Sequence, residues 1–235
     1  MGIVINQSIK NTIITYIGFG IGAINTLFMY VQFLGDTYYG LVGYILSAAN
    51  IMMPLMAFGV HNTLVKFYNE YKTEKEKSEF LTFVLFLPFL LIIPFSIIGY
   101  FGYHQIASFL SKENNIVYDY VWQIPVIGLC MGYFEIFYAW VKVHFQSVFG
   151  AFVKEVVLRI LVTIALFAVY FNWISPVEFV YALMGIYLFT LIIMKLFAFK
   201  VKFPLLSFKI PTNYKVVIVY SLFIIVSGGI ANLFL

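Results

Sequence analysis

The sequence has few charged residues. Asp, Glu, Lys and Arg make up 10% of the 235 residues, whereas hydrophobic residues make up 63% and the mean hydropathy is +0.98. Water-soluble domains typically carry about 25% charged and about 45–50% apolar residues. This scarcity of charge excludes an ordinary water-soluble domain and predicts a protein that crosses a membrane several times.

The residues that build disulfides, metal sites and catalytic motifs are also scarce. The single cysteine, Cys130, lies in an apolar run, which excludes a disulfide framework and a Cys-x-x-Cys metal site. The three histidines are isolated from one another, and the sequence has no His-Glu-x-x-His motif and no Gly-rich phosphate loop. We therefore expect no enzymatic activity, no metal and no cofactor, and we leave coupling to a cation or proton gradient open.

Long apolar runs are what the sequence contains instead. A helix needs roughly 20 apolar residues to cross a hydrocarbon layer about 30 Å thick. By this measure the sequence predicts six spans, at residues 12–33, 41–65, 80–103, 120–141, 156–171 and 177–199. A seventh run starts at Val216 and continues to Leu235.

The predicted organisation has three parts. Residues 1–199 form an N-terminal transmembrane lobe of six helices, residues 200–215 form a cytoplasmic amphipathic connector, and residues 216–235 are the truncated start of a second lobe. Gly22-Ala-Ile-Asn25 in the first span is similar to Gly229-Ile-Ala-Asn232 in the seventh. Because such an echo is typical of transporters built from two repeats, we expect the sequence to stop inside a larger protein.

Three segments are predicted to lie outside the spans. Residues 1–11 read as a short polar lead and residues 104–119 as a polar loop. In residues 142–154, apolar side chains interleave with basic and polar ones. That pattern is typical of a helix that lies in the membrane interface.

The basic residues predict the orientation of the chain. Assigning the N-terminus and the segments 66–79, 142–159 and 195–215 to one side collects thirteen of the fourteen Lys and Arg residues, and only Lys112 falls on the other side. Cytoplasmic loops of membrane proteins carry an excess of Lys and Arg. The N-terminus is therefore predicted to be cytoplasmic.

Two stretches resemble a known family. The sequence LGDTYYGLVGYILSAANIMMPLMAFGVHNTLVKFY, at residues 34–68, resembles the first hairpin of the oligosaccharide flippases in the multidrug/oligosaccharidyl-lipid/polysaccharide exporter superfamily. The stretch FQSVFGAFVKEVVLRIL, at residues 145–161, is similar to the start of their fifth span. The positions that carry the first resemblance are Gly35, Asp36, Tyr39, Gly40, Leu41, Gly59, Lys66 and Tyr68.

The resemblance implies a fold and a function. The fold would be all-α and polytopic: the six-helix N-terminal lobe of a two-lobed, V-shaped, MATE-like exporter, followed by the start of a seventh helix. The function would be to move an undecaprenyl-linked oligosaccharide across a bacterial cytoplasmic (inner) membrane by alternating access, for surface polysaccharide biosynthesis. The partners would be the lipid-linked oligosaccharide, the lipid bilayer and a glycan polymerase or glycosyltransferases, with no nucleic acid.

The chain departs from the family at the first two spans. Relatives that carry lipid-linked peptidoglycan precursors place arginines and an acid there, to meet the pyrophosphate. Neither span of this chain contains Lys, Arg, Asp or Glu. Their uncharged polar candidates for a substrate or ion pathway are Asn25, Gln32, Asn50 and His61. The phosphates would then be held by the second lobe or by cations of the loops.

Glu135 is the one acidic residue well inside a predicted span, where a charge costs about 2.5–3.5 kcal/mol on insertion scales. It is a candidate for ion coupling or substrate contact, or it forms a structural pair with a basic residue such as Arg159. Arg159 is a candidate for binding phosphate, or it pairs with Glu155 one helical turn earlier. His61 either meets substrate or is an ordinary interfacial histidine.

Three functions remain open from the sequence. The lack of an acidic residue in the first span and the Tyr-Gly turn at Tyr39 favour a flippase over the first alternative, a cation-coupled multidrug exporter of the same superfamily. The second alternative is a membrane fragment or scaffold that does not transport.

Overall fold

The computed structural model describes residues 2–233, and it describes side chains at residue 2 and at residues 5–228. The described residues are helical with no strand. The helices are α1 (Gly2–Ile24), η1 (Asn25–Met29), α2 (Tyr30–Met56), α3 (Val60–Phe67), η2 (Tyr68–Glu70), α4 (Glu74–Phe86), α5 (Phe89–Phe101), α6 (Tyr103–Leu110), η3 (Asn115–Tyr120), α7 (Gln123–Lys142), α8 (Ser147–Phe152), η4 (Val153–Val157), α9 (Leu158–Tyr170), α10 (Pro176–Val201) and α11 (Tyr214–Leu233). The side chains of residues 229–232 lie outside the described ones. The internal repeat inferred from the similarity between the first and seventh runs therefore stays a prediction.

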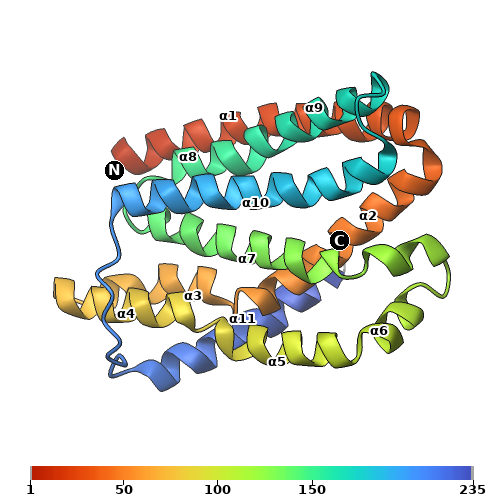
Figure 1. Ribbon diagram of the computed structural model, residues 1–235. Helices are drawn as coiled ribbons and strands as arrows, with labels where there is room; N and C mark the ends of the chain where they lie inside the picture. Colours follow the sequence, from red (N-terminus) through yellow and green to blue (C-terminus); the bar gives the residue numbers. More distant parts are fainter. Residues whose placement is uncertain (1, 234–235) are drawn as a thin grey trace.

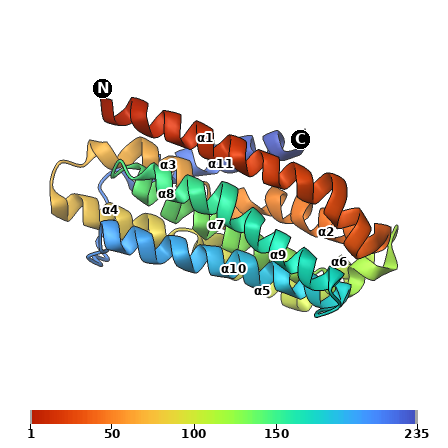
Figure 2. The same cartoon turned by 90° about the horizontal axis from the view of Figure 1, so that it is seen from above.

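The helices form an elongated bundle in which the chain runs repeatedly along the long axis (Figures 1 and 2). Helix α7 is central. Of its most apolar stretch, 67% is buried, whereas the corresponding share in the other long apolar helices is 17–28%. It packs against α2, α3 and α10. Helices α8, η4 and α9 continue into one another and lie beside α1 and α10.

Four helical stretches of the described residues are long and apolar enough to cross a membrane: Ile5–Met56, Glu74–Phe101, Gln123–Lys142 and Pro176–Val201. The apolar helix Tyr214–Gly228 is shorter. Many large apolar side chains on these helices face outward, including Phe19 on α1, Phe101 on α5 and Phe223 on α11. Length, composition and outward apolar faces together indicate a membrane protein.

The gap between the first two predicted spans contains a turn at Gly35. This glycine has φ 72° and ψ 165°, inside what is otherwise a continuous helical path from η1 into α2. A positive φ is readily adopted by glycine and rarely by other residues. The turn is tighter than predicted, because residues 36–40 are already helical.

The second predicted span is broken between α2 and α3. Pro54 lies near the end of α2, and Phe58 and Gly59 have positive φ values of 50° and 63° before α3 begins. A Cβ at Gly59 would collide with the Ser221 carbonyl of α11. The break therefore gives α11 a place to pack, and a 2.8 Å hydrogen bond between the Thr63 and Ser221 hydroxyls lies in the same contact.

Local capping signals start two of the long helices. The Thr73 hydroxyl accepts from the Glu76 backbone N–H and the Glu76 carboxylate accepts from the Thr73 N–H, so α4 begins with a capping box. Ser175 and Glu178 form the same arrangement at the start of α10, with Pro176 in the first turn. The third predicted span consists of the end of α4 followed by α5. The helix is interrupted at Pro88 between them, as expected of a proline.

The three segments predicted to lie outside the spans are largely helical. Residues 2–11 belong to α1, and residues 104–119 contain most of α6 and η3. Residues 142–154, predicted to lie in the membrane interface, contain only a short turn with a positive φ at Phe145, and the helix that restarts at Ser147 continues into the bundle as far as Tyr170. Its apolar residues Val153 and Val156 are buried in the bundle, so the amphipathic pattern reflects helix packing.

Candidate functional site

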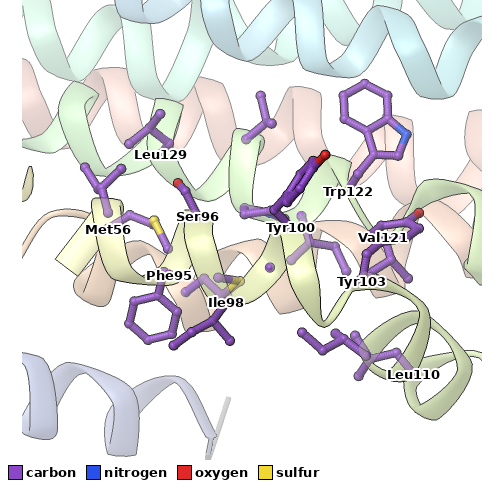
Figure 3. Close-up of a pocket in the computed structure, with 17 residues that line it drawn as sticks. Met56, Phe95, Ser96, Ile98, Tyr100, Tyr103, Leu110, Val121, Trp122 and Leu129 are labelled. Atoms are coloured by element: carbon purple, nitrogen blue, oxygen red, sulfur yellow. The ribbon is translucent and has the colours of Figure 1, made fainter.

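Two spaces between helices are candidates for the functional site, and the larger of these two lacks charge. Its volume is about 540 Å³, and it lies between α5, α6, α7 and the end of α2. Figure 3 shows that its labelled side chains are mostly aliphatic or aromatic, with polar atoms only on Ser96, Tyr100, Tyr103 and Trp122. Such a lining suits hydrocarbon and offers no group that would hold a charged ligand.

The second space is smaller, about 270 Å³, and is lined by charged side chains. It lies where α2, α7, η4, α9 and α10 meet. Its lining residues are Asn50, Met53, Cys130, Met131, Phe134, Glu135, Lys154, Glu155, Leu158, Arg159, Tyr187 and Thr190. We call it the charged cavity.

Glu135 of α7 and Lys154 of η4 form the first ion pair of the charged cavity. Lys154 Nζ donates to Glu135 Oε1 at 2.5 Å, and the side chains are 47% and 13% exposed, respectively. The sequence predicted that a basic residue on the next helix would pair with Glu135 and gave Arg159 as the example. The partner is Lys154 instead, because the helix extends back to Ser147 and brings Lys154 opposite α7.

Glu155 and Arg159 form the second ion pair, as the sequence predicted from their spacing. Arg159 Nη1 donates to Glu155 Oε2 at 2.6 Å and to the Glu155 carbonyl at 2.8 Å. Lys154 and Glu155 lie in the π-helical segment η4. A π-helical turn contains an extra residue, and such turns are frequent at functional sites.

Helix α1 packs closely against the Arg159 side chain. A Cβ built at Gly22 would lie 2.8 Å from Arg159 Nε, and one built at Gly18 would collide with Arg159 Nη1 and the Glu155 carbonyl. A Cβ at Gly20 would meet nothing within 4 Å. Of the small residues on α1, Gly18 and Gly22 therefore provide the room that the guanidinium occupies, as small residues do between membrane helices.

Asn25 holds the turn of α9 that carries Arg159. Its side chain is buried, its Nδ2 donates to the Arg159 carbonyl at 3.2 Å, and its Oδ1 accepts from the Thr163 hydroxyl at 2.9 Å. These bonds satisfy the polar atoms of an amide placed among apolar helices. Asn25 therefore holds the backbone of Arg159 in place but does not itself line the charged cavity.

The predicted site residues thus divide into two groups. Glu135, Arg159 and Asn50 line the charged cavity, with Asn25 behind them. Gln32 is exposed outside it, and His61 on α3 is partly buried with no hydrogen-bond partner at Nδ1 among the described residues.

The sequence reading missed Lys154, Tyr187 and Thr190 as cavity residues. The sequence does point to Lys154, since the charged pair Lys154-Glu155 lies between Val153 and Val156 in an otherwise apolar run. In the part of the chain that the structure describes, no group of three His, Cys, Asp or Glu side chains could hold a metal ion.

The fold and the cavity define a class: a helical membrane protein with two partly exposed ion pairs in a cavity between helices. No model of a known protein family, no curated protein and no solved structure matches the chain.

Proposed function

We propose that this chain is the N-terminal, MATE-like lobe of a flippase that moves an undecaprenyl-linked oligosaccharide from the cytoplasmic to the outer leaflet by alternating access. The observation that carries the proposal is the charged cavity, in which two cations and two carboxylates lie together between helices of a membrane protein. Charged groups inside membrane proteins are costly and typically mark a substrate or ion pathway.

Each cation in the cavity has a carboxylate partner that a substrate would replace. Lys154 and Arg159 are held by Glu135 and Glu155, so the charges that line the cavity balance one another. A diphosphate offers the same type of acceptor oxygen with more charge, and Arg and Lys both bind phosphate oxygens well. In this proposal, binding transfers the two cations from their carboxylates to the diphosphate.

The remaining lining residues suit the sugar part of the substrate. Asn50 and Thr190 carry polar groups that can bond hydroxyls, and Tyr187 and Phe134 carry aromatic rings beside them. A cavity with net negative charge would indicate an exporter of cationic drugs. In the charged cavity, the two acidic side chains are matched by two basic ones. The charge balance therefore favours the flippase over the multidrug exporter.

The proposal is tested by removing the two cations in the cell that makes the glycan. We expect Lys154→Met and Arg159→Met each to lower transport about tenfold, because hydrogen bonds to charged groups contribute about 1.5–3 kcal/mol. The measurements are surface glycan and accumulated lipid-linked intermediate, with Lys112→Met as a control far from the cavity. Normal glycan in both variants, or drug sensitivity with normal glycan on deletion, would contradict the proposal.

A further inference from the structure

A second apolar space contains one lysine. It is a crevice of about 570 Å³ between α4, α5, α7, α10 and the chain segment that follows α10. Leu188, Leu191, Ile192, Lys195 and Phe199 line it from a single face of α10. Lys195 is the one charged residue of its lining.

Lys195 lies inside the helix, and no acidic side chain of the described residues pairs with it. It precedes the end of α10 at Val201 by six residues, which is about 9 Å of helix. No ion pair of the described residues includes it, and its Nζ lies 5.7 Å from the centre of the Phe199 ring. The ammonium group therefore extends toward the end of α10, as lysines of membrane helices do when they reach the polar interface.

The segment after α10 closes the crevice on that side and is firmly attached. Lys202 Nζ donates to Glu74 Oε2 at 2.5 Å, the Ser207 N–H donates to the Thr82 hydroxyl at 3.0 Å, and the Tyr71 hydroxyl donates to Asn213 Oδ1 at 2.5 Å. Three contacts to α4 and its preceding turn thus fix an otherwise extended segment. We call residues 202–213 the strap.

The strap exposes both apolar and basic side chains. Phe203, Leu205, Leu206, Phe208 and Ile210 are each at least 57% exposed. Lys202 and Lys209 alternate with them, and Lys200 and Lys215 flank the strap. Exposed apolar side chains interleaved with lysines are typical of a surface that lies among anionic lipid headgroups. The crevice therefore opens at the level of the headgroups.

We propose that the crevice binds an anionic phospholipid. Its phosphate pairs with Lys195, and an acyl chain lies along Leu188, Ile192 and Phe89. The charge complementarity selects this occupant, since an anionic headgroup has a net negative charge to offset the lysine, whereas a zwitterionic headgroup already offsets its phosphate with its own cation. Basic pockets between membrane helices bind anionic headgroups in the same way. The site is separate from the charged cavity and does not depend on the proposed transport.

The test measures lipid retained by the purified 235-residue chain in detergent, by native mass spectrometry. Dioleoyl phosphatidylglycerol and dioleoyl phosphatidylcholine are offered in equal amounts, so that only the headgroup differs. We expect about fivefold more phosphatidylglycerol bound by the unaltered chain, the effect of one lysine near a lipid surface. Equal retention of the two lipids would overturn the proposal without any variant being needed.

Variants then locate the site. Lys195→Met is expected to abolish the preference for phosphatidylglycerol, whereas Lys195→Arg and the distant Lys112→Met are expected to keep it. Ile192→Trp, which fills the crevice, is expected to lower retention of both lipids. A full preference in Lys195→Met, with the protein folded by circular dichroism, would place the lipid elsewhere and refute the site.

Discussion

At the residue scale, the pairing of Glu135 with Lys154 gives the most direct prediction. Glu135→Gln removes the charge that the cation exchanges for substrate, and we expect transport to fall about tenfold. The amount of protein in the membrane should not change, because Lys154 is 47% exposed and can still reach solvent. Transport is followed by the appearance of surface glycan, and Glu113→Gln in an exposed loop is the control.

A charge swap separates pairing from function at the same position. The double variant Glu135→Lys with Lys154→Glu keeps an ion pair but moves the cation from η4, beside Arg159, to α7. We expect the double variant to be as stable as the unaltered protein but not to transport. If the swap restores transport in full, the pair is structural and the role proposed for Lys154 is wrong.

At the element scale, α1 offers a matched pair of glycines that differ in what they face. Gly22→Leu would push against Arg159, whereas Gly20→Leu faces open space. Both changes raise helix propensity by a similar amount, so the contact is the difference between them. We expect Gly22→Leu to destabilise the protein by about 1–3 kcal/mol, the usual effect of overpacking, and Gly20→Leu to be neutral or stabilising.

Thermal unfolding in detergent measures the outcome, with the midpoint read from intrinsic tryptophan fluorescence. A lower midpoint for Gly22→Leu alone is the expected result. Equal midpoints for the two variants would mean that α1 does not press on Arg159, and that the close packing of α1 against α9 and η4 is not important for stability.

The same elements show what could be predicted from the sequence. Glycine and proline act locally: the turn at Gly35 falls in the gap between the first two predicted spans, and the helix breaks lie next to Pro54 and Pro88. The pair Glu155 and Arg159 was also found, because a spacing of four residues determines it. These features depend only on the neighbouring backbone.

Features that depend on packing between distant segments were not found. The bond between Lys154 and Glu135 joins residues that are far apart in the chain, and it requires the helix to start at Ser147 rather than at residue 156. From the sequence, the interleaved pattern of residues 142–154 fits an interfacial helix as well as a helix packed in the bundle. Only the structure shows that α7 and α1 cover its apolar side. Hydrophobic periodicity identifies a helix and leaves its partner undetermined.

At the scale of the whole molecule, the alternating direction of the helices gathers the basic segments at one end. The N-terminus, the connection from α3 to α4, the connection from α7 to α8 and the strap all lie at the left end of the bundle in Figure 1, opposite the end where α6 lies. Lys154 and Arg159 line the charged cavity and Lys112 follows α6, whereas the other Lys and Arg residues lie in these end segments or in the helices that adjoin them. The positive-inside rule then predicts that the left end is cytoplasmic.

Cysteine labelling tests this orientation, because the chain has only one native cysteine. Cys130 is buried, and Cys130→Ala provides a background with no other thiol. In intact cells, a membrane-impermeant maleimide is expected to label Lys112→Cys, and to label Lys75→Cys and Lys215→Cys only after permeabilisation. All three positions are exposed, so burial does not limit the reaction. Labelling of Lys75→Cys in intact cells, with Lys112→Cys protected, would reverse the predicted orientation and would place the strap among outer-leaflet headgroups.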